Sequence, residues 1–272
     1  MRLVLDPRFV AFEQLANRPN LFRIVGRTYT ETWHSMFLGW LLDPKGSHGL
    51  GGFGMQRLLL AAAEGAAVAP DELRTLAMNV AAFGDFDDAE VFPSERNPEE
   101  HTIRIGNSNR RRDVFVKNVK VGGVNPDNAV VVVEQKVFAP PDDEQCNLYS
   151  EWLDTEFGDR IKLPILLAPT PDPEERLIDD QRWLVLDYQS LHDDVLVPIL
   201  EHQQLNSLAR SLIEQYADAL RMPMNGTKLA VSQEEKDLAK ELFDRHRNTF
   251  DALFEVLTET EDNPDLSALV KA

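Results

Sequence analysis

The chain has 272 residues, of which 43% are hydrophobic, and it carries a formal net charge of −18. This composition allows a substantial buried core, whereas the acidic balance argues against broad, nonspecific adhesion to nucleic acid, because phosphate contacts rely on Lys and Arg. One cysteine, Cys146, leaves no intramolecular disulfide or cysteine-rich zinc site.

Hydropathy and the N-terminal sequence indicate where the protein works. No run approaches the roughly 20 apolar residues that a membrane span needs. The first residues carry charges throughout and lack the apolar segment and cleavage site of a secretory signal. We therefore expect a cytoplasmic protein with no membrane association.

The first 80 residues predict helices that pack on the core. Apolar residues at helical spacing indicate helices over 9–15, 31–42, 55–66 and 71–79. The glycine-rich stretch 45–54, KGSHGLGGFG, matches neither the phosphate-loop nor the dinucleotide spacing. We therefore interpret it as a turn between helices, and the helices as the cover of one face of a sheet.

A β-rich region follows, within a core predicted over residues 81–222. Short strands are expected at 89–92, 111–116, 130–137, 161–168 and 183–186. The sequence VGGVNPDN predicts a hairpin turn between the second and third of these strands. Residues 142–157 predict a helix long enough for a crossover to the fourth. Helical sequence then runs over 188–220, with an expected interruption near Pro198.

Residues 223–272 predict a linker and an amphipathic helix. Ser232 and Glu235 have the spacing of a capping box. The apolar stripe of this helix comprises Leu238, Leu242, Phe250, Leu253, Phe254 and Leu257. Such a stripe usually faces its own chain, which is the favoured interpretation. The alternative is that it binds a protein partner or a second copy of the chain.

The strand VVVVEQK, residues 130–136, is the most informative part of the sequence. Side chains alternate along a strand, so Glu134 and Lys136 share a face and Gln135 points away. Asp113, on the preceding predicted strand, supplies another carboxylate nearby. Asp, Glu and Lys at adjoining strand ends suit metal-assisted hydrolysis, although an i, i+2 pair of opposite charges is also common as a solvated surface ion pair.

These residues carry a resemblance to a known family. Asp113, then Glu134-x-Lys136, then a helix with Gln145 and Tyr149 four residues apart resembles the PD-(D/E)XK nuclease superfamily, including the Q-x-x-x-Y element of its RecB-like branch. The segment 31–51, ETWHSMFLGWLLDPKGSHGLG, is similar to the opening of a bacterial family of this superfamily. The resemblance covers about residues 30–191, and it implies an α/β restriction-endonuclease-like core, a central mixed sheet flanked by helices. Arg112 stands where the superfamily often has Pro.

The resemblance also implies a metal site. Asp113 and Glu134 would bind Mg²⁺ or Mn²⁺, hard cations that prefer carboxylate oxygens, with a backbone carbonyl near Gln135 completing the protein ligands. Bound metal would acidify a water and neutralise phosphate charge. Lys136 would orient that water or stabilise the transition state.

Two further elements have alternative roles. Glu31 matches an acidic residue that members of the group carry on an early helix near the metal, but Thr28 and Glu31 also fit a capping box. Gln145 and Tyr149 share one helical face. They either contact the metal-binding carboxylate or the nucleic-acid backbone, or they belong to the edge of the core.

Basic residues around the first site strand are candidates for phosphate contacts. Arg110, Arg111 and Arg112 form a run beside Arg104, although such runs often only face solvent. His48, in the glycine-rich loop, either contacts phosphate or donates a hydrogen bond within the loop.

The function that these features favour is a Mg²⁺-dependent nuclease that cleaves phosphodiesters, with DNA as the expected polymer. The roles that members of the superfamily commonly have suggest restriction or phage defence. One alternative is a catalytically inactive protein that keeps the nuclease fold and binds or scaffolds a partner. Another is a hydrolase of small phosphoesters.

Overall fold

The computed structural model describes residues 3–16, 19–25, 30–65, 69–93, 102–105, 108–122, 127–137, 141–169, 178, 180–220 and 233–252. The chain forms two compact units, one from residues 20–229 and the other from residues 1–19 together with 230–272. The boundaries expected at residues 80 and 222 remain predictions. No helix in the described ranges is long and apolar enough to cross a membrane.

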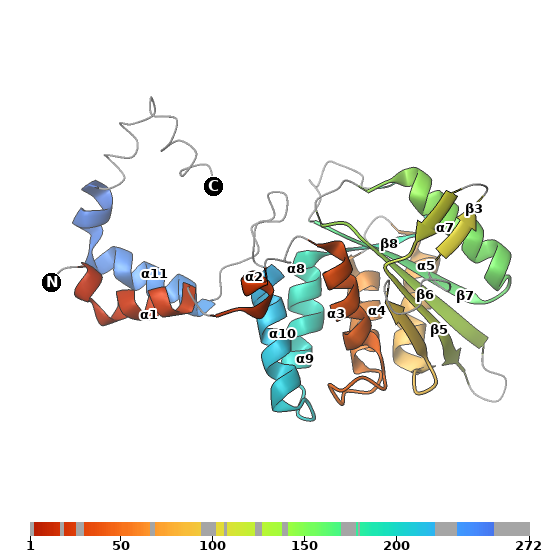
Figure 1. Cartoon of the computed structure of the whole chain (residues 1–272), viewed down its shortest axis with the longest axis horizontal. Coiled ribbons are helices and arrows are strands. Elements are labelled where there is room, and N and C mark those ends of the chain that lie inside the picture. The colour runs from red at the N-terminus through yellow and green to blue at the C-terminus, as the bar shows by residue number, and fades with distance from the viewer. Residues whose placement is uncertain are drawn as a thin grey trace. The chain divides into compact units, whose positions relative to one another are not determined.

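A mixed sheet of six strands forms the centre of the larger unit (Figure 1). The strand order is β1-β5-β6-β7-β8, with β2 also paired to β5. The β5–β6 pair is antiparallel, whereas β6–β7 and β7–β8 are parallel. The strands are β1 (Gly84–Asp85), β2 (Glu90–Pro93), β5 (Val114–Val121), β6 (Asp127–Gln135), β7 (Ile161–Ala168) and β8 (Leu184–Asp187). The predicted mixed sheet is thus confirmed.

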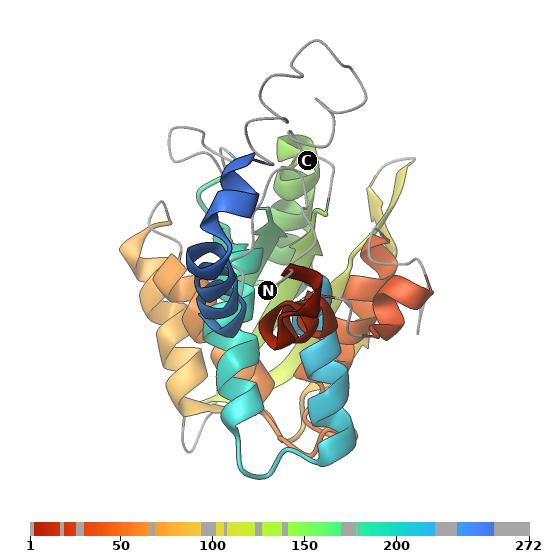
Figure 2. The same ribbon diagram turned by 90° about the vertical axis from the view of Figure 1, so that its left-hand side faces the viewer.

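Helices cover both faces of this sheet. Because side chains alternate along β6, Val131 and Val133 face a core that includes α3, α4, α5 and α10. Val130 and Val132 face the other side, where they pack with Cys146 and other residues of α7. Figures 1 and 2 show this layered arrangement. The helix α7 (Asp143–Phe157) is the predicted crossover, since it joins the parallel strands β6 and β7.

Proline residues affect the remaining helices of this unit in different ways. The helix α3 ends at Leu42, where Asp43-Pro44 prevents continuation. The predicted helix over 188–220 is divided, but Pro198 lies in the first turn of α9 and the chain leaves the helix only after Glu201. The helices are α2 (Leu21–Ile24), α3 (Glu31–Leu42), α4 (Phe53–Gly65), α5 (Asp71–Phe83), α8 (Tyr188–Ser190), the π-helical segment η2 (Leu191–Leu196), α9 (Val197–Glu201) and α10 (Ser207–Leu220).

One predicted strand, at 111–116, is corrected by the structure. Arg111 ends the short strand β4 (Ser108–Arg111), which pairs with β3 (Thr102–Ile105) in a separate two-stranded ribbon. β5 begins only at Val114. Between them Asp113 leaves the ladder, and its side chain accepts a hydrogen bond from the Gln135 backbone N–H.

The smaller unit contains both ends of the chain. Its elements are η1 (Leu3–Leu5), α1 (Pro7–Ala16) and α11 (Gln233–Arg245). α1 and α11 lie side by side (Figures 1 and 2). The fully buried Asp6 lies 3.0 Å from Nε2 of His246, and Leu242 is buried. The apolar stripe therefore packs within its own chain at Leu242, whereas Ser232, Leu253, Phe254 and Leu257 lie outside the described residues.

Candidate active site

Strand register brings Asp113 and Glu134 together. Val114 pairs with Val133 in the antiparallel β5–β6 pair. Asp113, which precedes β5, and Glu134, which follows Val133 in β6, therefore lie at the same end of the sheet. Asp113 Oδ2 accepts a hydrogen bond from the Gln135 N–H at 2.7 Å. The two carboxylates predicted from sequence thus share one edge of the sheet.

Glu134, Lys136 and Gln145 form one hydrogen-bonded group, which with Asp113 we call the Glu134 cluster. Lys136 Nζ lies 2.9 Å from Glu134 Oε1 and 2.9 Å from Gln145 Oε1. Gln145 Nε2 donates to the same Glu134 oxygen at 2.7 Å. The side chains of Lys136 and Glu134 are only 11% and 4% exposed. This burial contradicts the alternative of a solvated surface ion pair.

The start of α7 positions Gln145. Asp142 caps this helix and accepts hydrogen bonds from the backbone N–H groups of Glu144 and Gln145. Gln145 also donates to the Tyr149 hydroxyl at 2.9 Å, and Tyr149 is fully buried. Gln145 and Tyr149 therefore combine both predicted roles, contact with the carboxylate and membership of the core. The helix was predicted to begin at residue 142, but the capping role of Asp142 was not predicted, although an Asp three residues before a Gln is a helix-start signal.

Glu31 belongs to the same region. It is the first residue of α3, with Thr30 at the cap position, so it is not the third helical residue that a capping box requires. Its Oε1 accepts a hydrogen bond from the Val137 N–H at 3.2 Å. The capping-box alternative is therefore wrong, although Thr28 itself lies outside the described residues. Glu31 is instead attached to the chain directly beyond Lys136.

Burial and mutual repulsion perturb the acidic groups. Burial, with the nearby Glu31 charge, raises the pKa of Asp113 to about 6, against hydrogen bonds from Gln135 and Ser35. Burial and the Asp113 charge raise the pKa of Glu134 to about 8, although Lys136 opposes this. Such strongly shifted pairs of titratable groups mark candidate active sites.

The cluster offers a partial set of metal ligands. No group of three or more His, Cys, Asp or Glu side chains in the described part of the chain is gathered closely enough to hold a metal ion. However, Mg²⁺ needs only one or two carboxylates and usually keeps several waters. Glu134 Oε2 is buried and has no hydrogen-bond partner among the described residues. A cation there would satisfy this oxygen and offset the repulsion between Asp113 and Glu134, so the residues present fit such an ion.

The backbone and the side chain of Gln135 have different surroundings. Its backbone N–H is taken by Asp113. Its side chain is fully buried, and neither amide atom has a hydrogen-bond partner in the described ranges. Only its backbone carbonyl was predicted as a metal ligand, and that role remains a proposal.

Two predicted phosphate contacts are not supported. His48 is fully buried; its Nδ1 accepts from the Leu50 N–H at 3.0 Å, which leaves Nε2 to donate to the Asp43 carbonyl. It therefore closes its own loop. Arg112 is 3% exposed, and its guanidinium lies 4.4 Å from the Phe115 ring centroid and 4.3 Å from that of Trp152. This cation contacts aromatic rings inside the protein.

The other basic candidates lie in the ribbon. Arg110 and Arg111 are residues of β4, whose backbone is described, but their side chains lie outside the described part. Their role as phosphate contacts remains a prediction.

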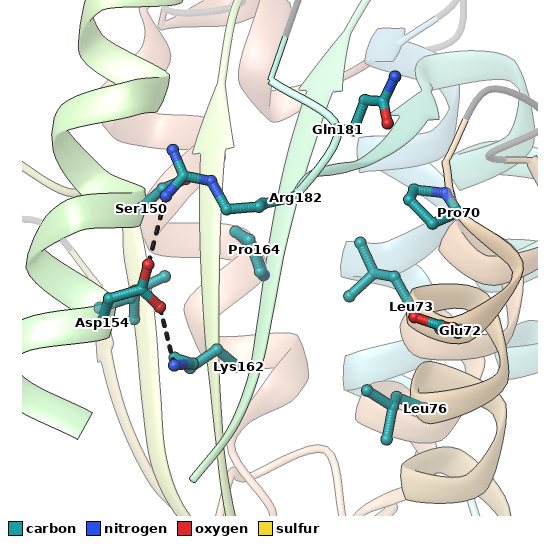
Figure 3. A pocket seen from close by; sticks show the side chains of 11 residues that line it. Pro70, Glu72, Leu73, Leu76, Ser150, Asp154, Lys162, Pro164, Gln181 and Arg182 are labelled. Atoms are coloured by element: carbon teal, nitrogen blue, oxygen red, sulfur yellow. Dashed lines mark hydrogen bonds and ion pairs between the residues drawn. The ribbon is translucent and has the colours of Figure 1, made fainter. Parts of the chain in front are cut away.

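A pocket of about 260 Å³ lies between α5 and α7, apart from these residues (Figure 3). Asp154 lies between Lys162 and Arg182, at 2.8 Å and 3.3 Å, so both cations are already paired with acidic groups. The lining residues are Pro70, Glu72, Leu73, Leu76, Ser150, Leu153, Asp154, Lys162, Pro164, Gln181 and Arg182. None of them belongs to the Glu134 cluster.

The mixed sheet, the helices on both its faces and the Asp113–Glu134–Lys136 edge define an α/β protein of the restriction-endonuclease-like class. A family model described as the PD-(D/E)XK nuclease superfamily matches residues 19–218, and the chain belongs to this superfamily. No curated protein and no solved structure matches the chain significantly.

Proposed function

We propose that this protein is a divalent-metal-dependent nuclease that hydrolyses phosphodiester bonds in DNA. The observation that carries the proposal is the state of Glu134: one carboxylate oxygen is held by Lys136 and Gln145, while the other is buried without a hydrogen-bond partner in the described residues. That arrangement orients a free oxygen at the sheet edge that Asp113 also occupies. Membership of a nuclease superfamily supports the same conclusion.

Asp113, Glu134 and the Gln135 backbone carbonyl are the proposed ligands, with Glu31 close by. A bound Mg²⁺ or Mn²⁺ supplies an acidified water and stabilises negative charge on the scissile phosphate. Lys136 has three N–H donors, and two are directed at Glu134 and Gln145. The third remains to orient the attacking water or to bind a phosphate oxygen as charge develops. Gln145 holds both Lys136 and Glu134 in place.

The finer assignments belong to the same proposal. We place the protein in the RecB-like branch on the Gln145–Tyr149 contact, and we infer a cytoplasmic role in restriction or phage defence. These inferences rest on resemblance and residue order.

Cleavage of labelled DNA and RNA, single- and double-stranded, with Mg²⁺, Mn²⁺ or EDTA tests the proposal. Wild type should cut DNA only with metal, and Glu134→Gln and Lys136→Met should not cut. Asn147→Ala, an exposed position on the same helix as Gln145, is the matched control and should retain activity. Activity of both active-site variants at the wild-type rate contradicts the proposed site. Absence of cleavage by folded wild type favours the catalytically inactive alternative.

A further inference from the structure

Tyr188, the first residue of α8, is fully buried in the core of the larger unit. Its hydroxyl has no hydrogen-bond partner among the described residues. Burial without a partner destabilises the folded state, because the hydroxyl gives up its hydrogen bonds with water. Such groups are rare in native proteins, and those that occur commonly bind a water or an ion or serve a reaction.

The surroundings of Tyr188 lead to Asp113. The Tyr188 ring centroid lies 6.3 Å from that of His34 in α3. The next residue of that helix, Ser35, hydrogen-bonds to the Asp113 carboxylate. Tyr188 and Asp113 therefore lie beside adjacent residues of one helix.

The charges around the Tyr188 hydroxyl agree with this position. Burial is the main cause that raises the pKa of Tyr188 well above its ordinary value, and the nearby Tyr216 acts in the same direction. The negative charges of Asp113 and Glu31 raise this pKa further, so both carboxylates lie within electrostatic range of the hydroxyl. The hydroxyl is thus near Asp113 but makes no direct hydrogen bond with it. A water can bridge two polar groups across such a gap.

The buried amide of Gln135 faces the same core as Tyr188. Val133 belongs to the core cluster that contains Tyr188, and alternation along β6 places Gln135 on the same face. Gln135 pairs with Leu167 of β7, and Leu167 pairs with Leu186 of β8, two residues before Tyr188. Only β7 separates the other two strands, which are therefore about 10 Å apart. Two side chains with unpartnered polar atoms among the described residues thus share one face at the end of the sheet that carries the Glu134 cluster.

We propose that Tyr188 is a positioning residue for the metal site: its hydroxyl donates a hydrogen bond to one buried water, which donates in turn to the Asp113 carboxylate and contacts the Gln135 amide. A buried water needs two to four polar partners, and these three groups supply them. Asp113 can accept this bond in addition to its others, because a carboxylate has about four lone-pair sites.

The inference rests on the proposed nuclease function and adds a support for the second carboxylate of its metal site. Gln145 holds Glu134 from the face of the sheet that α7 covers. The water bridge from Tyr188 holds Asp113 from the opposite face. Groups that orient a metal ligand in this way typically change metal affinity when they are removed.

The test compares wild type with Tyr188→Phe, which keeps the ring and removes only the hydroxyl. The matched control is Tyr216→Phe. Tyr216 is also buried in this core, but its hydroxyl already has a protein partner, Nδ1 of His34 at 3.0 Å. Thermal unfolding in EDTA measures what each hydroxyl contributes without metal, and isothermal titration of Mg²⁺ measures the metal site. Cleavage rates are recorded over a range of Mg²⁺ concentrations.

Tyr188→Phe should lower the midpoint of thermal unfolding in EDTA by about 2–4 °C and weaken Mg²⁺ binding about tenfold, with cleavage recovering at high Mg²⁺. Tyr216→Phe should also lower the midpoint but leave Mg²⁺ affinity unchanged. An unchanged or raised midpoint for Tyr188→Phe overturns the water bridge, since removing a buried hydroxyl that has no partner is neutral or stabilising. Equal Mg²⁺ affinities for wild type and Tyr188→Phe overturn the positioning role.

The share of Gln135 in the bridge is tested by Gln135→Met, alone and combined with Tyr188→Phe. Because both side chains hold one water, the midpoint shift of the double variant should be smaller than the sum of the single shifts. Additive shifts contradict a shared water.

Failure of this inference differs from failure of the proposed function. Wild type that binds Mg²⁺ and cleaves, with Tyr188→Phe identical to it, refutes the role of Tyr188 alone. Folded wild type that neither binds Mg²⁺ nor cleaves refutes the nuclease function and this role together.

Discussion

The side-chain amide of Gln145 donates to Glu134 at 2.7 Å, and its oxygen accepts from Lys136 at 2.9 Å. One residue on α7 thus contacts both the carboxylate of Glu134 in β6 and the ammonium group of Lys136, which directly follows that strand. The amide can serve both partners because it has an acceptor and donors in one planar group. This relationship makes Gln145 a positioning residue for the proposed reaction.

Replacing Gln145 by Ala should lower single-turnover cleavage and Mg²⁺ affinity by about 10–100-fold, as is common when a residue supporting a metal ligand is lost. Thermal unfolding should show that the variant remains folded. The control is Asn147→Ala, which removes an amide from an exposed position of the same helix. A cleavage defect of equal size in both variants would mean that α7 is merely destabilised.

The substitution Glu31→Gln separates the effect of the Glu31 charge from that of its hydrogen bond with Val137. The Gln side chain keeps an oxygen that can accept from the Val137 N–H, as Glu31 does at 3.2 Å, but it removes a negative charge from the metal site. We expect Mg²⁺ affinity to fall several-fold and cleavage to recover at high Mg²⁺, measured by metal titration of the cleavage rate. Unchanged metal dependence would limit Glu31 to anchoring the chain at Val137.

The stability of the metal-free protein should depend on pH through the two buried carboxyls. The folded state raises the pKa of Asp113 to about 6 and of Glu134 to about 8, so it binds more protons than the unfolded chain between about pH 4 and 8. Their contribution to stability is therefore complete below about pH 4 and is lost as pH rises through these values.

Urea unfolding in EDTA at about pH 5 and pH 9 measures this effect as the difference between wild type and Glu134→Gln. Between these two pH values, the free energy of unfolding of wild type should fall by about 2–4 kcal/mol more than that of the variant. Added Mg²⁺ should restore the stability of wild type at the higher pH. Parallel pH profiles for the two proteins would show that Glu134 does not titrate as described.

Arg112→Met tests the corrected role of Arg112. The guanidinium contacts the Phe115 and Trp152 rings, so its removal should cost about 1–2 kcal/mol in the free energy of unfolding. In a Glu134→Gln background, the salt slope of DNA binding should stay the same. A slope reduced by about 1 would instead restore Arg112 as a phosphate contact.

The site could be predicted from sequence where local rules apply. Alternation along β6 placed Glu134 and Lys136 together, and helical spacing placed Gln145 and Tyr149 on one face. Most of the strands of the central sheet and its crossover helix were predicted from local sequence, and the superfamily resemblance implied that the strands form a mixed sheet. These features depend on residues close in sequence or on the sheet architecture that the superfamily resemblance implied.

Other features depend on tertiary packing. A run of three arginines does not reveal that Arg112 contacts two rings while its neighbours belong to a separate ribbon. The strand β3 was missed because TIRI is a short alternating segment within a polar region. His48 was considered for phosphate because its loop is rich in glycine, but its buried hydrogen bonds with Asp43 and Leu50 appear only in three dimensions.

Isothermal titration of Mg²⁺ into wild type and into Asp113→Asn/Glu134→Gln tests the central claim most directly. Wild type should bind the ion and release protons, because the carboxyl groups of Asp113 and Glu134, whose pKa values are raised, ionise when the metal binds. The proton release is detected as a binding heat that depends on the buffer. The folded double variant should show no binding. Equal binding by both proteins, or none by wild type, would contradict the assignment of this edge of the sheet as the metal site of a nuclease.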